Sequence, residues 1–276
     1  MKLFDQCIYH MLKGNQEYIQ KSIVTPFLSY SRSVPFWLGK SIGDFPKNNA
    51  NILSKVKEYP CILVAANNKY ILKFIDRYID SITIDSNIDF YIYWIDDEPE
   101  TSNQVREKLS IISDKYSAGK FFIEYEKCPA FFDIRSYFAC KRFIFVKKIL
   151  KERVFAIITD IDYLVKGDLK RFINEIENNR YDVFVKLNNN NISSFFPWLK
   201  VTAGTFVVKN SSIGRYFIEL FIFIFHQTFN PHGFNWGIDQ NILTCLVELF
   251  DSMKCIGNLL EIYEPFTVPY DIKLNV

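Results

Sequence analysis

Two aspartates, Asp160 and Asp162, follow an apolar run and are separated by a single residue. The run covers residues 154–158 and is mostly β-branched, which predicts a buried strand of a sheet covered on both faces. In α/β sheets, ligands bind just beyond the carboxyl ends of the strands, where these two carboxylates stand. Because residues i and i+2 of an extended chain point the same way, we expect both carboxylates to converge on one object.

Two converging carboxylates need a partner that removes their repulsion. At about 4 Å, two unpaired carboxylates repel by roughly 4 kcal/mol at an effective dielectric constant of 20. A shared proton or a divalent cation removes this cost, and hard oxygen ligands suit Mg²⁺ or Mn²⁺. The alternative is a pair of solvated aspartates in the turn after a strand. Residues 154–162 by themselves leave both interpretations open.

Arg142 is a second residue whose position indicates chemistry. Residues 135–150 have helical periodicity, and at 100° per residue Arg142 shares a face with apolar side chains, namely Phe138, Ala139, Val146 and Ile149. The opposite face is expected to be solvated and carries Lys141, Lys147, Lys148 and Lys151. A buried guanidinium is rare unless it meets an anion. Because this helix directly precedes the strand that ends at Asp160, the expected partner is Asp160, a bound phosphate or a sugar; a purely structural ion pair is the alternative.

The composition limits the classes of function. The chain has 276 residues, which is enough for one large α/β domain or one domain with an accessory piece. Hydrophobic residues make up 49% and aromatic residues 17%, which excludes wholesale disorder. The 33 basic and 31 acidic side chains leave a net charge of +2, so there is no general electrostatic case for binding nucleic acid. The six cysteines form no CxxC pair and are expected to be reduced core residues.

The sequence predicts a cytoplasmic protein. Residues 1–6 show no apolar h-region of a secretory signal. The most apolar helical stretch, residues 213–225, is interrupted by Arg215 and Glu219, and a membrane span needs roughly 20 apolar residues. No transmembrane segment is therefore expected, while peripheral contact with the inner face of the membrane stays open.

Strand and helix patterns alternate from residue 61 onward. Short apolar strand patterns are expected at residues 61–66, 90–95, 121–125, 154–159, 181–185 and 201–208. Helical patterns are expected at residues 69–82, 102–117, 135–150, 168–176 and 213–225, with another beginning near 237. This alternation predicts an α/β fold with a doubly wound, mainly parallel sheet flanked by helices. Residues 1–59 are expected to form an N-terminal extension packed on a main domain of residues 60–276.

Five motifs stand in order between residues 61 and 250. They are Ala65-Ala66-Asn67-Asn68-Lys69-Tyr70, Arg142, Asp160-Ile161-Asp162, Thr202-Ala203-Gly204 and Asp239-Gln240. Each motif is common by itself, but their order and spacing together resemble the retaining nucleotide-sugar glycosyltransferases of the GT-A fold, the galactosyl- and glucosyl-transferring group numbered family eight. The resemblance implies a GT-A-like domain and a hexosyltransferase.

The resemblance implies that two of the motifs bind the nucleotide sugar. The nucleotide base would be held by a small residue, an amide and an aromatic residue, namely Ala65, Asn67 and Tyr70. The donor sugar would lie beside Thr202, Ala203 and Gly204, and small residues within a strand also let a ligand or another backbone approach closely. Two positions depart from the family, which has an asparagine where this chain has Thr202 and an acid where it has Asn67.

The other three motifs are expected, again from the resemblance, to carry the chemistry. Asp160 and Asp162 would bind Mn²⁺ or Mg²⁺ against the donor diphosphate, where a cation stabilises the departing charge. Arg142 would touch the donor sugar. Asp239 or Gln240 would support an oxocarbenium-like centre at the anomeric carbon, although Asp239 also falls near an expected helix start, where short polar side chains cap backbone N–H groups. The family's third metal ligand, a histidine in a C-terminal segment, has no counterpart in this sequence.

The expected function is metal-dependent transfer of a hexose from a UDP-sugar to a glycan or glycolipid acceptor, with retention, in polysaccharide biosynthesis. Two alternatives stay open. One is a non-catalytic protein of the same fold that binds a nucleotide or a carbohydrate. The other is a phosphatase of the haloacid dehalogenase type, because four apolar residues followed by DxD also open the first motif of that family.

Overall fold

The computed structural model describes residues 25–34, 59–82, 88–116, 120–129, 134–188, 197–233 and 235–269. Most of the predicted N-terminal extension lies outside these residues. The described part of the extension consists of one helix, α3 (Thr25–Ser33), and the residues that immediately precede the first strand.

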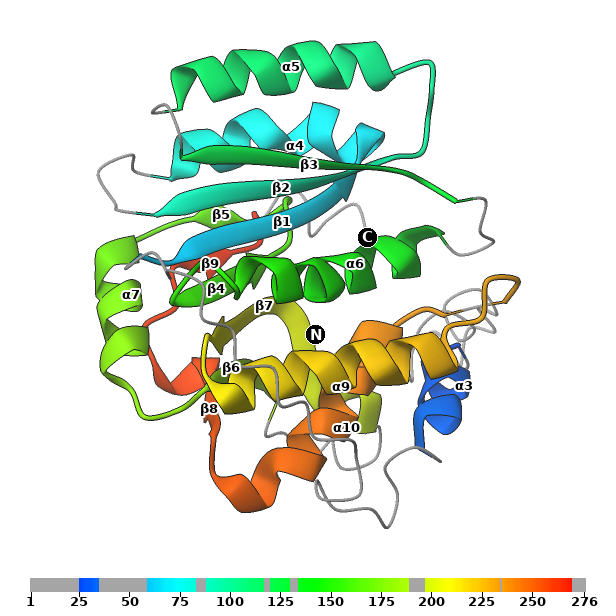
Figure 1. Ribbon diagram of the computed structural model, residues 1–276, viewed down its shortest axis with the longest axis vertical. Coiled ribbons are helices and arrows are strands. Elements are labelled where there is room, and N and C mark those ends of the chain that lie inside the picture. The colour runs from blue at the N-terminus through cyan, green and yellow to red at the C-terminus, as the bar shows by residue number, and fades with distance from the viewer. Residues whose placement is uncertain are drawn as a thin grey trace, which may run out of the picture.

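A mixed sheet runs through the centre of the described structure (Figure 1). Its seven strands are β1 (Cys61–Asn67), β2 (Asp89–Asp96), β3 (Phe121–Lys127), β4 (Phe155–Thr159), β6 (Val183–Leu187), β7 (Val201–Lys209) and β8 (Ile256–Asn258). Their spatial order is β3-β2-β1-β4-β7-β6-β8. Only β7, among these seven, runs against its neighbours. The predicted α/β fold with a doubly wound, mainly parallel sheet is therefore confirmed.

Helices cover both faces of this sheet. On one face the apolar side chains of α4 (Asn68–Ser81), α5 (Ser102–Lys115) and α7 (Leu169–Asn178) pack in one cluster. On the other face, α6 (Ile134–Ile149), α9 (Ser212–Thr228) and α10 (Ile238–Phe250) pack in a second cluster. Figure 1 shows α4 and α5 on the side of the sheet away from α9 and α10. Short elements complete the described chain, namely the 3₁₀ turns η4 (Pro197–Leu199), η5 (Asp251–Met253) and η6 (Leu259–Glu261), and the two-stranded sheet of β5 (Leu164–Val165) and β9 (Phe266–Thr267).

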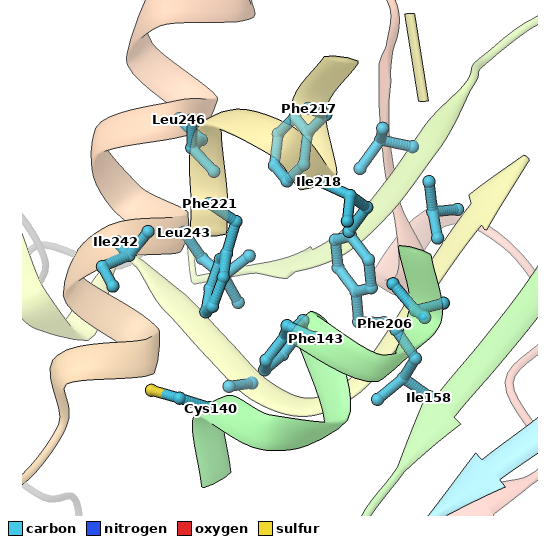
Figure 2. Close-up of a cluster of buried hydrophobic side chains, with 14 of the residues drawn as sticks. Cys140, Phe143, Ile158, Phe206, Phe217, Ile218, Phe221, Ile242, Leu243 and Leu246 are labelled. Atoms are coloured by element: carbon cyan, nitrogen blue, oxygen red, sulfur yellow. The ribbon is translucent and has the colours of Figure 1, made fainter. Parts of the chain in front are cut away.

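Aromatic side chains lock the second cluster together (Figure 2). The ring of Phe143 on α6 stacks on Phe221 of α9 with centroids 4.6 Å apart, and Phe206 of β7 lies 5.8 Å from Phe217 of α9. Fully burying one such side chain contributes about 1.5–3 kcal/mol. Figure 2 also shows Leu243 and Leu246 of α10 beside the ring of Phe221, and Ile242 belongs to the same cluster. The core therefore fixes α6 and α10 relative to each other.

The lysine face of α6 differs in part from the sequence expectation. Lys147 and Lys148 remain largely exposed, with side-chain exposures of 50% and 61%. Lys141 was expected to be solvated as well, which is wrong, because its side chain is 17% exposed and binds Glu126 of β3 at 2.7 Å. Glu126 also accepts hydrogen bonds from the hydroxyls of Tyr93 and Tyr137. The ion pair with this carboxylate at the end of β3 therefore keeps the Lys141 side chain largely buried.

The most apolar predicted helix is α9. Ser211 caps it, because its hydroxyl accepts a hydrogen bond from the backbone N–H of Gly214 at 2.9 Å. The charged residues that interrupt the apolar pattern are both bound, Arg215 to Asn210 at 2.7 Å and Glu219 to Lys147 at 3.4 Å. None of the described helices has the length and apolar character needed to cross a membrane.

Candidate functional site

Arg142 is the buried centre of a charge cluster. The residue is 3% exposed, and its guanidinium contacts carboxylates from two other elements. Nη1 binds Asp160 at the end of β4, Nη2 lies 3.3 Å from Oδ2 of Asp239 on α10, and Nε donates to the backbone oxygen of Ala139 at 3.0 Å. The expected contact between Arg142 and Asp160 is thus present, and Asp239 is a second partner.

The two carboxylates keep Arg142 charged. Burial by itself lowers the pKa of a guanidinium, but Asp160 and then Asp239 outweigh it, so that the pKa of Arg142 lies above its ordinary value. The apolar ring of Phe143 also faces the guanidinium carbon at 5.0 Å. The pair of Arg142 with Asp239 is buried, and removing one partner of a buried ion pair costs about 3–5 kcal/mol, since it leaves an uncompensated charge. The cluster therefore couples α6, β4 and α10.

The segment that carries Asp160 and Asp162 is a turn rather than a strand. β4 ends at Thr159, and the backbone N–H of Tyr163 donates to the backbone oxygen of Asp160 at 3.2 Å, which closes the turn. The expectation that both carboxylates project from one extended segment is therefore wrong. The turn is tied to β7, because the N–H of Asp160 donates to the backbone oxygen of Gly204 at 3.1 Å.

Negative charge exceeds positive charge at this turn. Burial raises the pKa of Asp160, Arg142 opposes this rise, and the nearby carboxylates of Asp162 and Asp239 add to it. Burial likewise raises the pKa of Asp162. Within the described ranges, no basic side chain lies at ion-pair distance from Asp162, and no three His, Cys, Asp or Glu side chains are grouped to hold a metal ion. The available donor set is two carboxylates, which suits a cation such as Mg²⁺ that keeps water ligands and takes oxygens from a substrate phosphate.

The small residues of β7 make room for a side chain of this protein. A Cβ atom on Gly204 would lie 1.9 Å from the hydroxyl oxygen of Tyr163 and 3.4 Å from Oδ2 of Asp160. Of the neighbouring residues, Ala203 is buried in the core, whereas Thr202 accepts a hydrogen bond from the amide of Asn188 at 2.9 Å. The close approach expected at this strand is therefore made by Tyr163. Burial, and next the charge of Asp160, raise the pKa of the Tyr163 hydroxyl.

Asp239 and Gln240 lie in the first turn of α10. The N-cap of the helix is Gly237, which has a φ of +73° and provides no side-chain cap. The interpretation of Asp239 as a helix cap is therefore wrong, because its carboxylate turns to Arg142 instead. Gln240 follows in the same turn and is partly buried. The left-handed glycine thus lets the chain enter the helix without using Asp239 as the cap.

The first motif stands at the same edge of the sheet. β1 pairs with β4 in parallel, with Leu63 opposite Ile158, so two residues farther along Ala65 is level with Asp160. Asn67 caps α4, since Oδ1 accepts from the N–H of Tyr70 at 3.1 Å. The Tyr70 side chain, 41% exposed, projects from the first turn of that helix.

The sequence reasoning missed two further polar residues at this edge. Asn68 is fully buried; its Oδ1 accepts from Nε1 of Trp94 at 2.6 Å and its Nδ2 donates to Asp96 at 2.8 Å. It stands two residues after the apolar run of residues 61–66, and this position was a usable signal of a buried polar residue. Tyr163 directly follows the two aspartates, but only the fold shows that it meets Gly204.

Comparison with known proteins gives similarities of fold. No family model matches the sequence, and no curated protein does either. Similar solved structures include mouse xyloside xylosyltransferase 1, with 8% identity, 74% of this chain and 85% of that chain covered, and a TM-score of 0.44. The glycosyltransferase GlyE of Streptococcus pneumoniae TIGR4 has 18% identity, with 73% of this chain and 46% of that chain covered, and a TM-score of 0.44. This chain therefore spans less than half the length of GlyE.

A third similar structure is that of the galactosyltransferase LgtC, solved in complex with donor and acceptor sugar analogs. It shows 15% identity, with 67% of this chain and 70% of that chain covered, and a TM-score of 0.46. All three similar structures bear names of glycosyltransferases, the class of enzyme that the sequence motifs resemble.

Proposed function

We propose that this protein is a metal-dependent glycosyltransferase that moves a hexose from a UDP-sugar to a glycan or glycolipid acceptor with retention. One observation carries the proposal, namely that the buried Arg142 contacts both Asp160 and Asp239. These partners lie 18 and 97 residues away along the chain. The motif resemblance assigns the three residues to the donor sugar, the diphosphate and the reacting carbon, and such roles require that they lie together.

The two aspartates of the turn are the proposed metal ligands. The excess negative charge at Asp160 and Asp162 supports this, since a divalent cation would offset it. When bound, Mn²⁺ or Mg²⁺ supplies Lewis-acid stabilisation of the departing nucleoside diphosphate. Asp160 has an additional task in this chain, because it binds Nη1 of Arg142 and so orients the guanidinium.

Arg142 is the proposed ligand of the donor sugar. A guanidinium has five N–H groups in a rigid plane, and the contacts with Asp160, Asp239 and the Ala139 carbonyl use three of them. Its orientation is therefore set before a substrate arrives, which lowers the ordering cost of binding. The remaining N–H groups serve hydroxyl or phosphate oxygens of the donor.

Gln240 is the proposed group at the anomeric carbon. Asp239 is already paired with Arg142, so we assign Asp239 to holding that arginine in place. Gln240, the next residue of the same helical turn, then brings a neutral amide to the reacting centre. An amide oxygen there stabilises the positive charge that develops as the glycosidic bond breaks. Ala65, Asn67, Tyr70, Thr202, Ala203 and Gly204 are the proposed donor-binding residues at the same edge of the sheet.

The proposal is tested by comparing ligand binding with turnover. A ligand that binds only the native state raises its melting temperature by mass action. UDP is therefore expected to raise the melting temperature more with Mn²⁺ than with EDTA, and a panel of UDP-hexoses is expected to release UDP. An equal UDP shift in EDTA would contradict the metal site.

The same assay separates the alternatives. Binding of nucleotide without release of UDP from any donor, across a panel of acceptors, would favour the non-catalytic binding protein. Hydrolysis of p-nitrophenyl phosphate that disappears in Asp160→Asn would favour the phosphatase. The control is Asp251→Asn, which changes an exposed aspartate of η5 and is expected to leave every signal unchanged.

A further inference from the structure

Helix α3, from the segment to which the sequence assigned no chemistry, is docked on the chain that leads into α10. The backbone oxygen of Pro26 accepts from the amide of Asn241 at 3.0 Å, across 215 residues. The hydroxyl of Ser29 donates to the backbone oxygen of Trp236 at 3.3 Å. Figure 1 shows α3 beside the C-terminal end of α9, from which the chain continues toward α10.

Arg32 of α3 holds Asn235, a residue that organises the turn before α10, of which residues 230–233 and 235–237 are described. Nη2 of Arg32 donates to Oδ1 of Asn235 at 3.2 Å. Asn235 is fully buried; its amide nitrogen donates to the backbone oxygens of Asn230 at 2.7 Å and Gly233 at 3.0 Å. Its backbone oxygen accepts from the N–H of Ile238 at 2.9 Å, the first residue of α10. One arginine of α3 is therefore bonded to the side chain that closes this turn.

The start of α10 depends on contacts from outside the helix. Its N-cap, Gly237, has no side chain with which to bind the first N–H groups, so the helix lacks the usual local restraint. The side chain of Pro26 lies 3.7 Å from the place where a Cβ of Gly237 would stand. The fully buried Asn241 is anchored to the backbone of α3. α3 thus supplies restraints that the first turn of α10 does not make for itself.

Asp239 lies within this restrained turn and binds Arg142, which in turn binds Asp160. We propose that α3 is a positioning element of the catalytic site and that Arg32, through Asn235, sets where Asp239 and Gln240 stand relative to Arg142. Arg32 is a positioning residue, because it bonds Ser29 and Asn235 and acts on Asp239 and Gln240 through Asn235. The inference rests on the proposed function and extends it to the N-terminal segment.

The test compares Arg32→Ala with a matched change elsewhere. Arg215 of α9 also binds an asparagine side chain, Asn210, at 2.7 Å, so Arg215→Ala removes the same kind of bond away from the turn. Misplacing a reacting group by about 1 Å can cost about a hundredfold in rate, so we expect Arg32→Ala to lower kcat at least about tenfold. In Arg32→Ala the donor KM and the UDP-induced thermal shift should stay within about twofold of the wild-type values. Arg215→Ala should leave kcat, the donor KM and the thermal shift unchanged. Arg32→Lys keeps a donor at this place and should recover most of kcat.

A second readout needs no activity. Amide hydrogen exchange at residues 238–241 should be faster in Arg32→Ala than in wild type and unchanged in Arg215→Ala. If wild type turns over no nucleotide sugar, the proposed function fails, and exchange alone decides whether α3 restrains α10. Unchanged exchange in Arg32→Ala would overturn the inference, and so would faster exchange with kcat unchanged.

A milder pair covers the case in which Arg32→Ala does not fold. Ser29→Ala removes the hydroxyl that donates to Trp236 and accepts from Arg32, and Ser31→Ala removes an exposed hydroxyl bonded within α3. Faster exchange at residues 238–241 and a lower kcat in Ser29→Ala, but not in Ser31→Ala, would support the inference. Equal behaviour of the two variants would overturn it.

Discussion

Nη2 of Arg142 lies 3.3 Å from Oδ2 of Asp239, although 97 residues separate them. Because Asp160 holds the other terminal nitrogen, the guanidinium is fixed between the end of β4 and the start of α10. Neither carboxylate lies close to Arg142 in the sequence, so the arrangement depends on the packing of α6 and α10 on β7. A substitution of Arg142, Asp160 or Asp239 is therefore expected to disturb both the end of β4 and the start of α10.

The first prediction concerns the shape of the Arg142 side chain. Arg142→Lys should lower kcat/KM by more than about tenfold, because an ammonium cannot reproduce the planar fork that joins Asp160 to Asp239. Turnover is measured per folded molecule, with folding followed by melting temperature. The matched control is Arg153→Lys, because Arg153 is also fully buried and bound to an aspartate, Asp89, at the start of β2. Arg153→Lys should lower stability and spare turnover; full turnover in Arg142→Lys would make that arginine structural only.

The second prediction separates the metal from the fold. Asp162→Asn should abolish the part of the UDP thermal shift that needs Mn²⁺. Its melting temperature without ligand should equal or exceed that of wild type, because Asp162 repels Asp160 and has no described ion pair to lose. The readout is thermal unfolding with UDP in Mn²⁺ and in EDTA. A Mn²⁺-dependent shift as large as that of wild type would remove Asp162 from the site.

The third prediction assigns the chemistry to the first turn of α10. Gln240→Ala should turn over donor at least about a hundredfold more slowly while binding UDP-sugar with Mn²⁺ almost as wild type does, which is the pattern expected of a group that acts mainly in the transition state. Asp239→Asn, which weakens one of the two carboxylate contacts that orient Arg142, should lower both turnover and donor affinity. Donor affinity by calorimetry and turnover by nucleotide release measure the two quantities separately. Turnover within a few-fold of wild type in both variants would move the catalytic centre elsewhere.

The fourth prediction uses the contact between Gly204 and Tyr163. Gly204→Ala should destabilise the protein by about 1–3 kcal/mol, because its methyl group would overlap the tyrosine hydroxyl. The same change in a Tyr163→Ala background should cost much less, since the ring is gone. Urea unfolding of the four proteins of this double-mutant cycle gives the coupling energy. Equal costs in the two backgrounds would show that the side chain of Tyr163 lies elsewhere in solution.

The fifth prediction concerns the pH dependence of stability. Burial tends to raise the pKa of Glu126, but its bonds with Lys141, Tyr137 and Tyr93 together lower the pKa below the ordinary 4.5. A carboxyl whose folded pKa is depressed contributes stability above its unfolded pKa, and that contribution is lost as the pH falls through the folded pKa. Glu126→Gln should therefore be less stable than wild type at pH 7, and the difference should shrink below pH 4.5. Denaturant unfolding across this range checks it; a difference independent of pH would contradict the linkage.

Long periodic patterns predicted most of the fold. The strand predicted at residues 61–66 and the helix predicted at residues 69–82 correspond to β1 and α4 within one residue at each end. They agree because the apolar residues that formed the two sequence patterns are the residues buried in these elements. The small elements β5, β8 and β9 were not predicted. They have two or three residues each, which is too few for a period, and β5 and β9 exist only because they pair with each other.

The site was predictable where a charged residue stood among apolar residues of the same helical face. Arg142 stood out as a charge on an apolar helical face, and the structure shows it buried against carboxylates. Two features depended on backbone geometry that the residue pattern does not encode. The chain turns at Asp160 instead of staying extended, and Gly237 takes the left-handed conformation that begins α10, so Asp239 is free to face Arg142.

The reversed direction of β7 brings its first residues back to the end of β6, where a backbone hydrogen bond joins the two strands. Because β7 is antiparallel to β6, Leu187 and Val201 are paired at the edge of the sheet where Asp160 lies. Asn188 ties the two ends together, since its N–H donates to the backbone oxygen of Lys200 at 2.8 Å. This clasp between Asn188 and Lys200 therefore helps to hold the register of β7, and with it the place of Gly204 next to the turn that carries Asp160.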